Sequence, residues 1–367
     1  MSKITLSNDK ITTQQIALAA ACLLPCAKLL EVPSLLARYA TGDLLLPALL
    51  HFLVQAGILF LILFAISQSE KTLFERLDEA LGKWSILFYA LFGVYFLLCA
   101  ILPLLDLEKF IYAAFFDTSP SVFSFIAFFV FSAFLCTKGL KTLARAADFC
   151  LFLYLIPFLA LIAMAFFAAD FSHLLPLFEN QFGDTMYAFT RTTPHFSDAV
   201  LLLPLIGNLR YKKGDAAKVL TGYGIGAAST LLFLATFLGI YSSIAPREHY
   251  ACSKIAEYFP ALDVIGRFDL LFVYALTVVL LIFTAMPLQY TTQFTCQGFG
   301  VKSPALVSAI LNIGLLLFLL FCNKYYNTIY EIISGKLPFV FWLIADIIPL
   351  FFLLLPKNKG AKEVKSA

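Results

Sequence analysis

The stretch Leu24-Pro25-Cys26-Ala27-Lys28-Leu29-Leu30-Glu31-Val32-Pro33 lies inside a hydrophobic segment that we place at residues 12–39. It brings two prolines and two charged side chains into a segment otherwise apolar and long enough to cross a bilayer. Proline removes a backbone donor and interrupts the helical hydrogen-bond pattern. The segment is therefore predicted to be a membrane helix that unwinds near its centre.

A second hydrophobic segment, at residues 184–208, is interrupted in the same way. Its middle reads Arg191-Thr192-Thr193-Pro194-His195-Phe196-Ser197-Asp198. Each of the two segments begins one half of the chain. Interrupted spans at matching positions of two halves indicate a binding site near the bilayer midplane, where unwound backbone lines a cavity.

Composition fixes the class of protein. Of 367 residues, 61% are hydrophobic and 13% are charged, and the mean hydropathy is +0.89. A soluble domain is about half apolar and about a quarter charged. We therefore expect an all-α polytopic membrane protein that forms a single membrane domain in the lipid bilayer.

Apolar stretches predict about ten transmembrane helices. We place them at 12–39, 44–67, 84–106, 119–137, 144–168, 184–208, 218–243, 269–294, 304–322 and 338–356. With a cytoplasmic N-terminus, most of the 26 Lys and Arg residues fall in cytoplasmic loops and tails. The charge distribution thus predicts that both termini are cytoplasmic, including a basic tail at residues 357–367.

Ten spans with a broken first and a broken sixth helix suggest a five-plus-five inverted repeat. The first repeat would cover residues 1–170 and the second residues 183–356. The N-terminus of a half-helix offers positive dipole density to a carboxylate, and a half-helix C-terminus offers carbonyl groups to an ammonium. A zwitterionic amino acid satisfies both.

Several different short motifs follow one another in a defined order along nearly the whole chain. They are Ile11, Thr12 and Gln15 at the start, Pro33 late in the first span, Ala40-Thr41-Gly42-Asp43 after it, Gly139-Leu140-Lys141-Thr142-Leu143-Ala144-Arg145 after the fourth span, and Phe196-Ser197-Asp198, Pro204 and Asn208-Leu209-Arg210-Tyr211-Lys212-Lys213 in and after the sixth. In this order and spacing the chain resembles the B subunits of spore germination receptors, within the amino acid–polyamine–organocation superfamily.

The resemblance implies the membrane subunit of a germinant receptor in the cell membrane or spore inner membrane. Such a subunit binds an amino acid or similar small polar nutrient and signals to a large membrane subunit and a lipoprotein. A secondary amino acid transporter, proton-coupled or an exchanger, is the alternative, because both functions need the same pocket. The chain departs from the family at Cys26-Ala27-Lys28, where a Gly is usual, and at Asp198, where Glu is usual.

The candidate ligand-binding residues lie at the two breaks and on the third and eighth spans, which flank the site in the resembled fold. They are Cys26, Ala27, Lys28, Tyr95, Pro194, His195, Phe196, Ser197, Asp198, Tyr274 and Thr277. Helix packing is the alternative role for Tyr95, Tyr274 and Thr277. Glu31 and Arg191 are candidate gate or ion-pair residues. Arg191 would form an outer gate, pair with Asp184 or extend its charged end to the membrane interface.

Lys28 is the most informative single residue. A charged lysine at a helix centre costs about 2.5–3.5 kcal/mol on insertion, so it is expected to face a cavity or a partner. It either contacts a ligand carboxylate or replaces a coupling ion, or it forms a structural pair with Glu31, Asp198 or Asp148.

His195 and Asp198 form either a proton relay or a structural polar cluster. The sequence shows no ligand set for a metal, no nucleophile–base pair and no cofactor motif. We therefore expect no enzymatic activity, no cofactor, no metal and no nucleic-acid partner.

Overall fold

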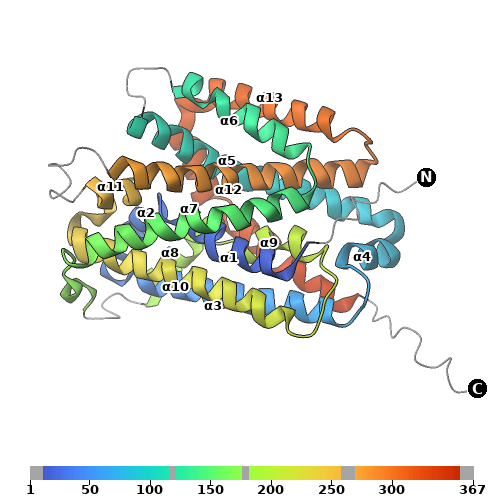
Figure 1. Cartoon of the computed structure of the whole chain (residues 1–367), viewed down its shortest axis with the longest axis horizontal. Coiled ribbons are helices and arrows are strands. Elements are labelled where there is room, and N and C mark those ends of the chain that lie inside the picture. The colour runs from blue at the N-terminus through green and yellow to red at the C-terminus, as the bar shows by residue number, and fades with distance from the viewer. Residues whose placement is uncertain (1–10, 116–120, 176–181, 258–268, 356–367) are drawn as a thin grey trace, which may run out of the picture.

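The computed structural model describes residues 11–115, 121–175, 182–257 and 269–355, and these residues form helices and no strand. The helices run largely side by side along the long axis of the molecule (Figure 1). They are α1 (Thr13–Lys28), α2 (Val32–Ala40), α3 (Leu45–Ser67), α4 (Leu73–Leu81), α5 (Ser85–Phe115), α6 (Ser121–Cys136), α7 (Leu140–Phe166), α8 (Phe182–Thr192), α9 (Asp198–Ile206), α10 (Asp215–Tyr241), α11 (Ala251–Glu257), α12 (Asp269–Phe299), α13 (Pro304–Cys322), α14 (Tyr326–Gly335) and α15 (Pro338–Trp342), with a π-helix (Leu343–Ile347) and a 3₁₀ helix (Ile348–Leu354) after α15.

Six stretches of helix are long and apolar enough to cross a membrane. They are Leu45–Ser67, Leu73–Ile111, Leu140–Phe166, Asp215–Arg247, Leu270–Phe299 and Pro304–Phe321. Two pairs of helices pass the same test together, with bends of 62° in Thr13–Lys28 plus Val32–Asp43 and 54° in Tyr326–Gly335 plus Pro338–Leu354. The chain is an integral membrane protein with six to eight candidate spans, two of them broken or bent.

The predicted number of about ten spans is higher than the number the helices support. The sixth predicted span consists of two short helices, α8 with 11 residues and α9 with 9, and α8 carries Asp184 and Arg191. In the fourth, the described apolar stretch Phe125–Cys136 is shorter than a full crossing. The short, polar α8 thus keeps the sixth segment out of the set of complete spans, whereas the fourth segment begins in residues outside the described part of the chain.

The first predicted break is confirmed. α1 ends at Lys28 and α2 starts at Val32, with Pro25 in the last turn of α1 and Pro33 in the first turn of α2. The sixth segment is also broken where the sequence places the break: α8 ends at Thr192, a 3₁₀ turn follows (Thr193–His195), and α9 starts at Asp198.

The last bent segment was not predicted. Gly335 ends α14, and Pro338 starts α15 after a two-residue link. Pro338 stands in the first turn of α15, where a proline is tolerated because the amide that it lacks would have no partner within the helix.

Elements far apart in the sequence meet at the end of the bundle that holds α4, opposite the end that holds α11 (Figure 1). The amide of Leu73 donates to the carbonyl of Gly207 at 3.0 Å, and Arg76 donates to the carbonyls of Ala65 at 2.6 Å and Leu355 at 3.1 Å. The charge rule assigns these connecting segments to one side of the membrane, and they do lie together.

The broken first span runs through the interior, where α1 packs against α7, α10 and α12. Its closest approach is to α10: a Cβ added at Gly222 would collide with the backbone of Ala17, and one at Gly226 with the backbone of Ala20. Gly224, on another face of α10, has no atom within 4 Å of its Cβ position. The small-residue face of α10 therefore serves helix packing.

We predict that Gly222→Ala or Gly226→Ala destabilises the protein by about 1–3 kcal/mol, because the added methyl group forces α1 and α10 apart. Gly224→Ala is the matched control and is expected to be neutral or slightly stabilising. Thermal unfolding of the purified protein in detergent measures the difference. Equal unfolding midpoints for all three variants would contradict the packing described here.

Candidate functional site

A buried ion pair joins the two broken segments. Lys28 is the last residue of α1, and Asp198 is the first residue of α9. The Lys28 Nζ donates to Asp198 Oδ1 at 2.6 Å, with the two side chains 3% and 1% exposed. Lys28 also donates to the carbonyl of Leu24 at 3.3 Å, within its own helix. The break in one half of the chain is therefore tied to the break in the other.

Other groups complete the surroundings of this pair. Tyr223 of α10 donates its hydroxyl to Asp198 Oδ2 at 3.1 Å. The Lys28 ammonium lies 5.3 Å from the ring centroid of Phe196 and 6.0 Å from that of Phe52, which adds cation–π stabilisation.

Of the three partners considered for Lys28, the structure selects Asp198. Glu31 instead lies 3.2 Å from the Nδ1 of His249, and Asp148 accepts a hydrogen bond from Gln15 at 3.1 Å. The Lys28–Glu31 pair within the first span does not form, because α1 ends at Lys28 and the helical spacing that would bring the two side chains together stops there.

A second polar link connects the start of α9 to the last segment of the chain. The amide of Ala199 donates to Gln55 Oε1 at 3.0 Å. This bond fixes the orientation of the Gln55 amide, so that its nitrogen donates to the carboxylate of Asp346 in the π-helix. Gln55 is thus the hydrogen-bond partner of the buried Asp346.

His51 of α3 supports the sixth segment from behind. Its ring stacks between those of Phe189 and Phe196, with centroid distances of 4.0 and 4.4 Å. Its Nε2 lies 2.9 Å from the carbonyl of Phe189 and 3.0 Å from the hydroxyl of Thr192. Phe196 is fully buried by these contacts, so it acts as a packing residue at the break.

Backbone groups of the first break are covered by α11. The amides of Ala251 and Cys252 donate to the carbonyls of Leu30 and Leu29, at 2.9 and 3.1 Å. We expected carbonyls of this break to be open to the ammonium group of a ligand. These two are instead satisfied within the protein.

A partly open cavity lies between the two breaks and the helices α5, α12 and α15. The centre of a water molecule can move within about 50 Å³ of the cavity, which gives room for roughly four water molecules. Its lining is Ala27, Leu30, Glu31, Val32, Leu98, Cys99, Leu102, Pro103, Asp106, Leu107, Pro194, His195, Leu201, Leu280, Phe283, Thr284, Pro287 and Phe341.

Four predicted site residues line this cavity: Ala27, Glu31, Pro194 and His195. The Nε2 of His195 is buried and has no hydrogen-bond partner among the described residues. His195 and Asp198 therefore do not form a mutual pair, since Asp198 is engaged by Lys28 and Tyr223.

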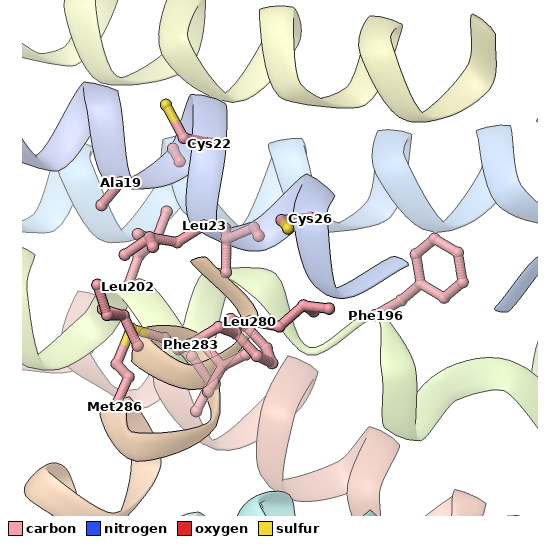
Figure 2. Packing of buried hydrophobic residues seen from close by; sticks show 14 of the residues in the cluster. Ala19, Cys22, Leu23, Cys26, Phe196, Leu202, Leu280, Phe283 and Met286 are labelled. Atoms are coloured by element: carbon pink, nitrogen blue, oxygen red, sulfur yellow. The ribbon is translucent and has the colours of Figure 1, made fainter. Parts of the chain in front are cut away.

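The remaining predicted residues at the breaks and in α5 and α12 lie behind the lining. Cys26 lies 3.5 Å from the carbonyl of Leu276, and the Thr277 hydroxyl donates to Val273 in its own helix at 2.7 Å. Ser197 and Tyr95 are buried. Figure 2 shows the apolar packing beside the break, with Ala19 and Leu23 of α1 gathered with Leu202, Leu280, Phe283 and Met286, and Cys22 directed to the other side of α1.

Two predicted site residues lie away from the cavity. Tyr274 is 59% exposed on the outer surface of α12. Arg191 lies over the ring of Tyr187, 4.9 Å from its centroid, so its contact is aromatic and not with Asp184.

Asp106 is the lining residue that sequence reasoning missed. It is buried in α5 and accepts a hydrogen bond from the Tyr326 hydroxyl at 2.8 Å. The sequence Asp106-Leu107-Glu108-Lys109 is typical of a span leaving the membrane, which hid it. The length of α5, which continues to Phe115, is the feature that moves Asp106 into the protein interior.

These features define a polytopic membrane protein of the permease type, with a cavity between broken helices. A family model described as "Spore germination protein" matches residues 10–327. The chain belongs to this spore germination family, as the motif order predicted. No curated protein sequence matches the chain.

We predict that Lys28→Met or Asp198→Asn alone destabilises the protein by about 3 kcal/mol, because each leaves a buried charge without its partner. The double variant, which removes both charges, is expected to be more stable than either single variant. Lys71→Met is the control: the Lys71–Glu79 pair is 44% and 51% exposed, and such pairs contribute little. Additive effects of the two single changes, seen in thermal unfolding, would contradict the pairing.

The His249–Glu31 contact predicts a pH dependence. The hydrogen bond with Glu31 raises the pKa of His249 above its ordinary value of 6.5, against partial burial; Glu248 adds to the rise and Arg38 opposes it. A raised folded-state pKa stabilises the fold below the unfolded value, and this contribution is lost as the pH rises through the folded-state pKa.

Wild type is therefore expected to unfold at a higher temperature than His249→Gln at about pH 5.5, and at the same temperature at about pH 8.5. Glu31→Gln in the His249→Gln background serves as the control. Because the imidazole is already absent, the difference between the double variant and His249→Gln should not change between the two pH values. A wild-type advantage of equal size at both pH values would show that the contact does not depend on the imidazolium.

Proposed function

We propose that this chain is the membrane subunit of a spore germinant receptor, and that it binds an amino acid or similar small polar nutrient in the cavity between the two broken segments. The observation that carries the proposal is the cavity itself, which is lined by residues of both breaks, including Ala27 and Glu31 from the first and Pro194 and His195 from the sixth. Membership of the spore germination family supports the biological role.

The dimensions of the cavity favour a small ligand. Its accessible space suits a molecule of few heavy atoms. Apolar side chains make up most of its wall, with a few polar groups among them, which is typical of small-molecule sites.

A signalling mechanism follows from what the cavity touches. Ala27 lines the cavity, and its neighbour Lys28 holds Asp198 at the start of α9. A ligand that moves the end of α1 would strain this ion pair and shift α9, which Gln55 connects to Asp346 in the last segment. A receptor needs only this ligand-dependent shift between two states. The shift would be passed to partner subunits, which we take to be a large membrane subunit and a lipoprotein.

The proposed orientation has both termini in the cytoplasm. The distribution of Lys and Arg supports it, as does the common position of α4, Gly207 and Leu355 at one end of the bundle. In this orientation α11, which donates to the carbonyls of Leu29 and Leu30, lies towards the opposite side of the membrane.

The first test is germination of spores that lack this gene, exposed to single amino acids, amines and sugars. Loss of the response to one nutrient, restored by the wild-type gene, is expected for a receptor subunit. Normal germination combined with altered amino acid uptake in growing cells would make the chain a secondary transporter and overturn the receptor assignment.

A second test fills the cavity. Ala27→Leu is expected to raise the nutrient concentration needed for a half-maximal response by at least about tenfold, since the added carbons occupy the ligand's space. Ala127→Leu, on an exposed position of α6, is the matched control and should respond as wild type. Immunoblots of spore membranes report whether both variants are present. A normal response from membrane-located Ala27→Leu would contradict the location of the site.

A further inference from the structure

The charged residues of the cavity are of one sign. Glu31, from the first break, and Asp106, from α5, are its acidic lining residues, and the described lining contains no lysine or arginine. Asp106 is 5% exposed, and Glu31 has a side chain 12% exposed. Two carboxylates facing a mostly apolar space require compensation by positive charge or by hydrogen-bond donors.

The protein supplies only part of that compensation. Glu31 Oε2 contacts His249, and Asp106 Oδ1 accepts from the Tyr326 hydroxyl. The ammonium of Lys109 lies over the ring of Tyr326, 3.3 Å from its centroid, and Lys109 does not line the cavity. Each carboxylate therefore keeps acceptor capacity for a further donor.

The groups that would bind the carboxylate of an amino acid are already engaged. At the start of α9 the amide of Ala199 donates to Gln55, and the first residue of the helix is itself a carboxylate, Asp198. The lysine nearest to the breaks, Lys28, is held by that carboxylate at 2.6 Å. A ligand carboxylate in the cavity would face Glu31 and Asp106, with no lysine or arginine in the described lining to pair with it.

One further lining group has no partner. The buried Nε2 of His195 makes no hydrogen bond within the described part of the chain. A primary ammonium carries three donors, and Glu31, Asp106 and His195 provide three polar groups around one space. The remaining wall, which includes Leu98, Leu102 and Phe283, suits a short alkyl chain.

We propose that the ligand of this cavity is a small primary amine recognised as its ammonium cation, in preference to a zwitterionic amino acid, an anion or a sugar. The inference rests on the proposed function, because it assigns a chemical class to the same site. Glu31 and Asp106 are its selectivity residues: they hold the ammonium by charge-assisted hydrogen bonds.

The test is ligand-dependent thermal unfolding of the full-length protein in lipid nanodiscs. The probes are n-butylamine, L-alanine and L-lactate, which are similar in size and differ in charge. We expect a rise in the unfolding midpoint with n-butylamine alone. Glu31→Gln and Asp106→Asn are each expected to weaken the apparent Kd at least about tenfold, the loss typical of a charge-assisted hydrogen bond.

Asp184→Asn, at an exposed carboxylate of α8, is the control and should bind as wild type. Binding of L-alanine or L-lactate that survives both Glu31→Gln and Asp106→Asn would overturn the cation class and leave the receptor proposal standing. Stabilisation by n-butylamine that is unchanged in both variants would place binding elsewhere and also overturn it. Absence of any shift, together with a normal nutrient response in spores lacking the gene, would remove the proposed function as well.

Discussion

The arrangement depends on one interaction, the buried ion pair between Lys28 and Asp198. Each charge alone would be costly in the membrane interior, and each stands at a helix end where the chain unwinds. Pairing them across the two halves of the chain lets both helices break without leaving an isolated charge. Tyr223, Phe52 and Phe196 surround the pair, so the first break is held against the break of the sixth segment.

Internal pairing of polar groups also determines what the breaks offer to a ligand. Unwound backbone in a membrane protein must find partners. Here α11 donates to the carbonyls of Leu29 and Leu30, and Gln55 accepts from the start of α9. Because these backbone groups are used within the protein, side chains set the chemistry of the cavity. Glu31 and Asp106 make it acidic.

Sequence reasoning was effective where local chemistry decides the outcome. The prolines and charges at residues 24–33 located the first break, and the interruption at residues 191–198 located the break of the sixth segment. It was less effective where tertiary contacts decide. Hydropathy counted α8 within a complete span because the short, polar helix is followed by the apolar α9.

The sequence also could not identify side-chain partners or the depth of individual residues in the membrane. Three carboxylates lay within reach of Lys28 on sequence grounds, and only the fold brings one of them, 170 residues away, to 2.6 Å. Asp106 was overlooked because its neighbours resemble a membrane exit. The bounds of α12 do not show which side of the helix faces outward, so the exposed Tyr274 was wrongly placed beside the site. Residues 1–10 and 356–367, with the predicted basic tail, lie outside the described part of the chain.

The most direct measurement is an experimental structure of the protein with bound nutrient, using the compound to which deletion of the gene abolishes the germination response. The account predicts ligand density between Ala27, Glu31, Asp106 and His195, with Lys28 and Asp198 still facing each other. Density at another place in the protein, with this cavity unchanged, would contradict it.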